Sequence, residues 1–439
     1  MTFDKSRDVV PYLLATAIGI AAVAPYLEFD GRLILEPDVH VGTVRIYYDA
    51  LAARSLTPLT VPGVNVYFEG HCLVYALALH AFNFVRGLIS AGAAPIVAAF
   101  DEHALVVIRC VNALARVLAT TVFFATVRRL TGRLPASLLL TFLFACSPQI
   151  FAMDLERIDH FMILPLVVIL HISVVIAAAE ANVRHGAVLG AALALIMSTK
   201  LSGFLFGGFP ALAMAVALAV HRRQPDIWKR QARVVAGALA AGLPLLALFM
   251  IRYVLHWPLF WELVTLGYRE QMTWTAVFNF TPRFYYNIDL FAENGWFFLA
   301  VTAAAAALVL ADAVLRRAPV SIWLVASLMA YSAAGAFAFK YDRGGYHLVP
   351  LYLYVIGLAF RIVDRWSALR PVKERRAVAA ALLLVLLVPV TVAAAAYSRS
   401  ADIALKRAES IALTRLAARD WMTAHFTPGM RICLLGSSQ

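Results

Sequence analysis

Residues 71–99, with the sequence HCLVYALALHAFNFVRGLISAGAAPIVAA, form an apolar stretch on which the topology of the whole chain depends. A helix that spans a membrane needs about 20 mainly apolar residues, so this stretch is long enough to cross. If it crossed once, however, the basic clusters that follow it would change sides of the membrane. We therefore predict that residues 71–99 lie in the membrane interface or form a re-entrant hairpin.

The composition of the chain requires a bilayer as its solvent. Of the 439 residues, 62% are hydrophobic and only 15% are charged, whereas soluble domains have roughly 45–50% apolar and about 25% charged residues. The sequence predicts an all-α polytopic membrane protein of about eleven transmembrane helices. The predicted spans cover residues 9–28, 104–127, 134–152, 160–180, 186–200, 201–221, 234–256, 295–315, 319–339, 346–363 and 377–397.

Basic residues predict the orientation of these spans, because positively charged loops stay on the cytoplasmic side. If Lys5 and Arg7 are cytoplasmic and residues 71–99 do not cross, the later basic clusters all face the cytoplasm. These clusters are Arg128, Arg129 and Arg133; Arg184; Arg222, Arg223, Lys229 and Arg230; Arg316 and Arg317; and Arg361, Arg365, Arg370, Lys373, Arg375 and Arg376. We expect a multi-pass protein of a bacterial inner (plasma) membrane, with a cytoplasmic N-terminus and an external C-terminus. The formal charge of +12 then reflects loops facing the cytoplasm and predicts no nucleic-acid partner.

The predicted domain organisation is simple. Residues 1–397 form a transmembrane domain with a first external loop at about 29–103, which contains short interfacial helices, and an aromatic external loop at about 257–294. Residues 398–439 form an external tail that is either short or the start of a truncated soluble domain. The four cysteines include no CxxC pair, so neither a zinc site nor a disulfide framework is indicated.

The first external loop carries the strongest concentration of catalytic residue types. Glu36, Asp38 and His40 place two carboxylates and an imidazole within five residues, just past a predicted span. A carboxylate at the membrane surface is a suitable general base for an attacking hydroxyl. The same groups could hold a divalent cation such as Mg²⁺ or Mn²⁺. The alternative is a solvated acidic loop that only enforces the topology.

Two further external segments carry isolated charges. Arg157 is suited to bind phosphate oxygens, although a salt bridge with Asp154 or Glu156 explains it equally well. Asp159 stands at the start of the next helix, where capping is its default role. Lys200 lies between two apolar runs and either extends its ammonium group to the interface or binds a lipid phosphate.

A fourth external segment, residues 340–347, contains Lys340, Arg343, Tyr346 and His347 around a glycine pair. Glycines let a backbone approach a phosphate closely. The cluster is positive, on the face that should be poor in positive charge, so topology alone does not explain it. We therefore favour a functional role for this segment.

Taken in order, these four loops resemble those of the GT-C superfamily of membrane glycosyltransferases, which includes protein O-mannosyltransferases and lipid A aminoarabinose transferases. The stretch Pro37-Asp38-Val39-His40-Val41-Gly42 is similar to the Asp-Glu-Val-His-Phe-Gly stretch in the first external loop of protein O-mannosyltransferases. Weaker similarities are Arg128-Arg129-Leu130-Thr131-Gly132-Arg133, Ser147-Pro148, Arg157-Ile158-Asp159, Thr199-Lys200, and the group Arg343, His347 and Pro350. The resemblance covers most of residues 1–397.

The resemblance implies an inverting transfer of a sugar from a polyprenyl-phosphate donor to a hydroxyl of a protein, lipid or polysaccharide acceptor on the external face. Asp38 takes the acidic place beside the Val-His pair, but Pro37 stands where the family has its other acidic residue, and Glu36 lies one position earlier. The base is therefore Asp38 or Glu36, and we favour Asp38.

The resemblance also implies that basic residues hold the donor phosphate. It assigns this role to Lys200 and Arg343, followed by Arg157 and Lys340. Four further site candidates are His40, Asp159, Tyr346 and His347, and a divalent cation on Asp38, Glu36 and His40 is an open alternative.

Two other functions stay open at this stage. An oligosaccharide ligase or polymerase with a diphosphate-linked donor would need the same residue types. A lipid or solute transporter would place paired charges in broken helices at mid-membrane, often within two repeats. The sequence has no internal repeat, although Arg109 and Arg116 lie within a predicted span without an evident role.

Overall fold

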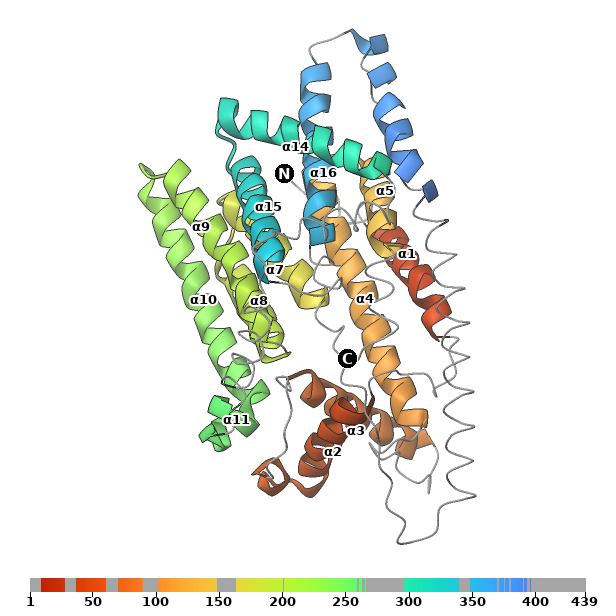
Figure 1. The fold of residues 1–439 in the computed structure, drawn as a ribbon, viewed down its shortest axis with the longest axis vertical. Coiled ribbons are helices and arrows are strands. Elements are labelled where there is room, and N and C mark those ends of the chain that lie inside the picture. The colour runs from red at the N-terminus through yellow and green to blue at the C-terminus, as the bar shows by residue number, and fades with distance from the viewer. Residues whose placement is uncertain are drawn as a thin grey trace.

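A computed structural model shows the chain as a bundle of long helices (Figure 1). The all-α prediction is confirmed, because the described residues contain helices, turns and no β strand. The structure describes residues 9–27, 37–60, 70–89, 102–147, 163–199, 201–258, 260–262, 265, 296–338, 348–368 and 371–395, with residues 375, 379, 390, 393 and 394 left out.

The first and longest helices run antiparallel to each other. Helix α1 (Val9–Leu27) packs along α4 (Glu102–Thr131), and the Tyr12 ring meets the Phe124 ring edge-on at 5.3 Å between centroids. One turn further along α1, the Thr16 hydroxyl lies 3.2 Å from the Thr121 hydroxyl. Residue numbers thus increase along α1 in the direction in which they decrease along α4, so the two helices are antiparallel. This is expected for two successive crossings in opposite directions.

Helices α5 (Leu134–Ala145), α7 (Ile163–Ala177), α8 (Val183–Thr199), α9 (Gly208–Val220) and α10 (Pro225–Phe249) follow along the chain. The pair α8 and α10 is in backbone contact. A Cβ added to Gly190 would lie 2.1 Å from the carbonyl oxygen of Ala238, so only glycine permits this approach.

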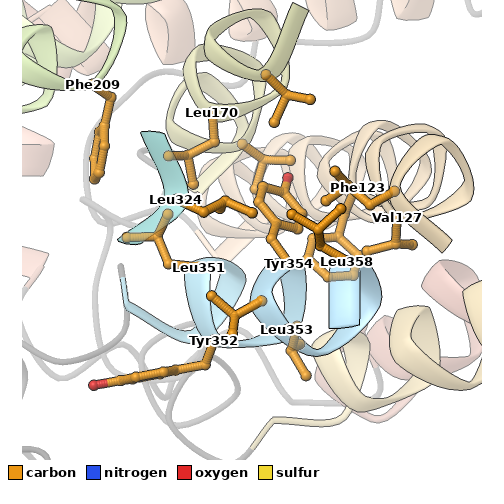
Figure 2. Close-up of a cluster of buried hydrophobic side chains, with 14 of the residues drawn as sticks. Phe123, Val127, Leu170, Phe209, Leu324, Leu351, Tyr352, Leu353, Tyr354 and Leu358 are labelled. Atoms are coloured by element: carbon orange, nitrogen blue, oxygen red, sulfur yellow. The ribbon is translucent and has the colours of Figure 1, made fainter. Parts of the chain in front are cut away.

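The centre of the bundle is α16 (Leu348–Ser367), which follows α14 (Trp296–Arg316) and α15 (Pro319–Ala338). Most of its residues are buried, and Figure 2 shows its side chains beside Phe123 of α4, Leu170 of α7 and Leu324 of α15. The Tyr354 ring stacks on Phe123 of α4 at 5.2 Å between centroids. Close packing of this kind replaces the hydrophobic effect inside a bilayer.

The turns between these helices gather basic residues at one end of the bundle, the upper end in Figure 1. We call it the basic end. It is tied together by ion pairs from Arg129 to Glu180 and from Arg133 to Asp364. This sorting of charge matches the one derived from the positive-inside rule.

The chain is a polytopic membrane protein. Among the described residues, five helices are long and apolar enough to cross a membrane by length and composition, and five shorter apolar helices accompany them. Ten of the predicted spans coincide with these helices or with α16, and helical segments occur in the eleventh, at 377–397. The total of eleven spans remains a prediction.

Within the stretch 71–99, which decides the topology, the described residues belong to one continuous helix, α3 (Gly70–Ile89). A hairpin within these residues is therefore excluded. The helix is one of the five long enough to span. Figure 1 places it beside α2 (Pro37–Ala53) at the end opposite the basic end, where α4 also begins. That this helix lies in the interface rather than crossing the membrane stays a prediction. The tail at 398–439 lies outside the described residues.

Candidate functional site

Most of the predicted site residues lie outside the described part of the chain. They are Glu36, Arg157, Asp159, Lys200, Lys340, Arg343, Tyr346 and His347. Asp38 and His40 fall in the first turn of α2, where the backbone is described but these two side chains are not. The site is therefore built from the residues that flank the predicted positions.

Helix α2, which carries Asp38, is fixed to α3 through Tyr48. The Tyr48 ring stacks on His80 at 4.2 Å between centroids, and Asn83 donates a hydrogen bond of 2.8 Å to the Tyr48 hydroxyl. The ring nitrogen Nε2 of His80 also lies 3.0 Å from the backbone carbonyl oxygen of Tyr48. Because α2 is one continuous helix, these contacts fix the direction in which it leads back to Asp38.

The first turn of α3 meets the last turn of α8 directly. A Cβ added to Gly70 would lie 2.1 Å from the hydroxyl oxygen of Ser198 and 3.0 Å from its carbonyl oxygen. Ser198 and Thr199 are buried, and both hydroxyls donate to the carbonyl oxygen of Leu195, at 2.9 and 2.8 Å. Lys200 is the next residue. The first external loop and the segment leading to Lys200 are therefore in contact.

The chain is equally well fixed after Lys200. The short helix η4 (Leu201–Gly207) lies so close to α8 that a Cβ on Gly203 would come within 2.2 Å of the carbonyl oxygen of Ile196. The Tyr331 hydroxyl of α15 donates to the Leu205 carbonyl oxygen. The backbone on both sides of Lys200 is thus held by packing and by hydrogen bonds.

A buried polar cluster, which we call the α3–α4 cluster, occupies the same end of the bundle. Tyr75 donates a hydrogen bond of 2.6 Å to the Asn112 side-chain oxygen, and the His71 ring meets the Tyr75 ring edge-on at 6.0 Å. Arg109, one turn before Asn112 on α4, is only 4% exposed. His71, Tyr75 and Asn112 were not predicted from the sequence. Polar residues inside apolar helices were the available signal.

A second buried guanidinium belongs to Arg252, which is 1% exposed in the short helix α11 (Ile251–Leu255). Helix α11 continues from α10 and contacts η2 (Thr57–Thr60) of the first external loop. Arg252 was also missed, although an arginine within the predicted span 234–256 is a clear signal of a site in a membrane protein.

Arg116, whose role the sequence left open, is structural. Its guanidinium donates to the carbonyl oxygens of Ala145 at 2.9 Å and Phe144 at 3.4 Å, and it lies over the Phe144 ring at 5.3 Å from the centroid. Both carbonyls lie at the end of α5, where the Phe144 oxygen also accepts from the backbone N–H of Ser147 at 3.4 Å. The arginine therefore supplies a side-chain donor to the Ala145 carbonyl oxygen and supplements the bonding of Phe144.

The described residues contain no group of three or more histidine, cysteine, aspartate or glutamate side chains that could hold a metal ion. The predicted cation ligands Asp38, Glu36 and His40 are outside that search because their side chains are not described. A divalent cation at this place stays a prediction. As residue types, the carboxylates predicted from the sequence are suited to remove a proton from a hydroxyl. The predicted basic residues are suited to stabilise a phosphate.

Comparison with solved structures identifies the fold. ArnT from Cupriavidus metallidurans, an aminoarabinose transferase bound to undecaprenyl phosphate, is similar with a TM-score of 0.58 and 17% identity over 98% of this chain and 82% of its own. The oligosaccharyltransferase of Archaeoglobus fulgidus is similar with a TM-score of 0.57 and 13% identity over 91% of this chain. The chain spans 56% of that enzyme, which has also been solved with an inhibitory peptide and a dolichol-phosphate.

Both of these proteins are GT-C superfamily members, so the resemblance drawn from the four loops is confirmed for the fold. No protein-family model and no curated protein sequence matches the chain. At identities of 13–17%, the similarity is one of architecture.

Proposed function

We propose that this chain is a membrane glycosyltransferase that moves a sugar from a polyprenyl-phosphate donor to an acceptor hydroxyl on the external face of a bacterial inner membrane. Three observations support the proposal: the GT-C fold, the likeness to a transferase solved with undecaprenyl phosphate, and the gathering of the first external loop around the end of α8. The acceptor is a protein, a lipid or a polysaccharide.

The contact between Gly70 and Ser198 carries the proposal. These residues are 128 positions apart, and their contact draws the loop that contains the acidic residues toward the segment that leads to Lys200. An enzyme of this class needs a base for the acceptor and a cation for the donor phosphate in one chamber. A topology that separated these two segments by the thickness of the bilayer would have excluded the reaction.

The proposed chemistry is a single displacement. Asp38, or Glu36 as the alternative, accepts the proton of the acceptor hydroxyl while its oxygen forms a bond to the anomeric carbon. The bond from that carbon to the phosphate oxygen breaks, and the lipid phosphate leaves with the electron pair. Attack from the opposite side inverts the anomeric configuration.

Cations stabilise the charge that develops on the leaving phosphate, and a water-poor site strengthens this effect. We assign this role to Lys200 and Arg343, with Arg157 and Lys340 in support. The buried guanidinium of Arg252 lies at the same end of the bundle and is a further candidate. Its neighbour η2 belongs to the loop that carries the acidic residues.

Paired measurements of carrier binding and turnover test the proposal. Undecaprenyl phosphate serves as the binding probe, and undecaprenyl-phosphate-linked hexoses, pentoses and aminoarabinose serve as donors. We expect Asp38→Asn to abolish transfer, by at least about 100-fold, with carrier binding unchanged. Lys200→Ala should weaken carrier binding about 10-fold or more.

The matched control for Asp38→Asn is Glu36→Gln, which removes the neighbouring carboxylate. Wild-type turnover in Asp38→Asn together with loss of turnover in Glu36→Gln would assign the base to Glu36. Wild-type turnover in both variants, or no binding of undecaprenyl phosphate by the wild-type chain, would refute the proposed mechanism.

Transfer of an oligosaccharide is the second candidate function, because the A. fulgidus oligosaccharyltransferase has a similar fold with a TM-score of 0.57. The two functions differ in their donors. A preference for diphosphate-linked oligosaccharides over monophosphate-linked monosaccharides, measured with the same preparation, would favour this second candidate.

A further inference from the structure

A cluster of guanidinium groups surrounds Arg129 at the basic end of the bundle, far along the helices from the proposed active site (Figure 1). Arg129 forms an ion pair with Glu180 in the turn between α7 and α8. Arg361 of α16 donates a hydrogen bond of 3.2 Å to the backbone carbonyl oxygen of Arg129. Arg365, one turn further along α16, is close enough to Arg361 to interact with it electrostatically.

Arg133 joins the cluster through its ion pair with Asp364, which also belongs to α16. We call Arg129, Arg133, Arg361 and Arg365 the inner arginine cluster. The cluster sets four arginines against the two carboxylates of Glu180 and Asp364, so these six side chains carry a formal charge of 4 − 2 = +2. Like charges held this close cost free energy unless an anion joins them.

The arginines are held in place by the fold. Arg129 and Arg133 are 33% and 34% exposed at the side chain, and each is bound to a carboxylate from a different element. Three elements therefore fix the guanidinium groups: the end of α4, the turn after α7 and the end of α16. A planar guanidinium held in this way presents a pair of donors that fits two phosphate oxygens.

Two tryptophans indicate the depth of this cluster in the membrane. Trp366, next to Arg365, is 39% exposed, and Trp228 in the first turn of α10 is 52% exposed at the same end of the bundle. Exposed tryptophans are enriched where lipid headgroups meet the hydrocarbon region. On α14, which packs against α16, Leu310 and Val314 expose apolar surface.

From these observations we propose that the inner arginine cluster binds the headgroup phosphate of an anionic phospholipid in the leaflet on the basic side. Basic pockets between membrane helices bind such headgroups in general. The excess of positive charge supplies the attraction, the fixed guanidinium groups supply the geometry, and the tryptophans place the cluster at headgroup depth. The proposal is independent of the sugar-transfer function.

Binding of phosphatidylglycerol, compared with phosphatidylcholine of the same acyl chains, tests this proposal on the purified full-length chain in detergent. The variant Arg361→Gln/Arg365→Gln removes two cations and leaves in place the arginines of the ion pairs Arg129–Glu180 and Arg133–Asp364. We expect it to weaken phosphatidylglycerol binding roughly 10- to 30-fold and to leave phosphatidylcholine binding unchanged. The matched control, Arg222→Gln/Arg223→Gln, removes the same charge from the turn before α10 and should change binding less than about 3-fold.

Arg361 also holds a backbone carbonyl, so the double variant could fail to fold. Arg365→Gln then serves alone, because Arg365 is exposed and its loss removes charge without opening the core. We expect this single change to weaken phosphatidylglycerol binding roughly 5-fold. Loss of binding that is equal in the control variant would overturn the proposal.

Three further outcomes also contradict the proposal. Equal affinity of the wild-type chain for phosphatidylglycerol and phosphatidylcholine would remove the role of the charge. Full competition by millimolar inorganic phosphate would identify a soluble anion as the ligand. Tighter binding of undecaprenyl phosphate that is lost in Arg361→Gln/Arg365→Gln would identify the carrier lipid as the occupant.

Discussion

Replacing Gly70 with alanine tests the contact between the first external loop and the end of α8. Gly70 is the first residue of α3, and Ser198 is the penultimate residue of α8. An alanine Cβ would lie 2.6 Å from the Cβ of Ser198 and 2.1 Å from its hydroxyl oxygen, which already donates to Leu195. The hydroxyl can rotate away only by giving up that bond, and the Cβ cannot move without the backbone.

The expected size of the effect follows from these distances. Ordinary contacts between such atoms begin at 3.4 Å, so the two helix ends must separate by about 0.8 Å at the Ser198 Cβ. Overpacking of this kind costs about 1–3 kcal/mol of stability. Lys200, which we propose as a contact of the donor phosphate, follows Ser198 by two residues, so we expect the same shift to weaken carrier binding. Loss of one charge-assisted hydrogen bond weakens binding about 10- to 100-fold.

Binding of undecaprenyl phosphate to the purified chain is the assay, since it does not require the sugar to be known. We expect Gly70→Ala to weaken this binding about 10-fold or more and to lower the Tm. The same substitution at Gly87, on the same helix, meets no atom within 4 Å. Gly87→Ala should therefore leave binding unchanged and stabilise the helix by about 0.5–1 kcal/mol.

A compensating substitution separates the contact from a general defect. Gly70→Ala/Ser198→Gly removes the Ser198 side chain and leaves only its carbonyl oxygen, at 3.0 Å from the new Cβ. We expect this variant to recover most of the binding. Wild-type affinity and Tm in Gly70→Ala would refute the contact itself. A loss in Gly70→Ala that Ser198→Gly does not relieve would show that the defect arises elsewhere on α3.

Three further substitutions test the buried contacts that support the site. Arg116→Met should lower the free energy of unfolding by about 1–3 kcal/mol, measured by thermal unfolding in detergent, because the Ala145 carbonyl oxygen at the end of α5 loses its 2.9 Å donor; an unchanged Tm would contradict this role. Gly190→Leu should lower the free energy of unfolding by at least about 3 kcal/mol, since the side chain would clash with the Ala238 backbone. Proteolysis of the segment between α8 and α10 should become faster. Tyr75→Phe should lower the free energy of unfolding by about 1–2 kcal/mol, because the buried Asn112 oxygen loses its 2.6 Å donor. If the free energy of carrier binding falls by more than the free energy of unfolding, the α3–α4 cluster belongs to the site.

Much of the fold could be predicted because membrane spans have a strong compositional signature. Apolar runs of about 20 residues separated by basic turns predict helices regardless of what they pack against. The charge pattern also predicted which helix ends gather together, and the ion pair of Arg133 with Asp364 joins two of those ends across more than 200 positions.

The contacts around the candidate site were harder to predict, because they depend on glycines that let two segments approach closely. Nothing in the sequence around Gly70 indicates a partner at Ser198, since the absence of a Cβ does not specify which residue packs against it. Arg109 was noted within a predicted span but given no role. Arg252 could have been found in the same way, because a guanidinium inside an apolar span is costly and needs a reason. The local motif drew attention instead to Asp38 and its neighbours.

Helix α8 connects these contacts into one structural unit. On one side, Gly190 fixes it against the backbone of α10. At its far end Gly70 and Gly203 approach it from two other segments, at Ser198 and at the carbonyl oxygen of Ile196. Each approach is short enough that a single methyl group would displace it. The position of the residue after Thr199 relative to the first external loop therefore depends on close glycine contacts of α8, none of which involves a charged group.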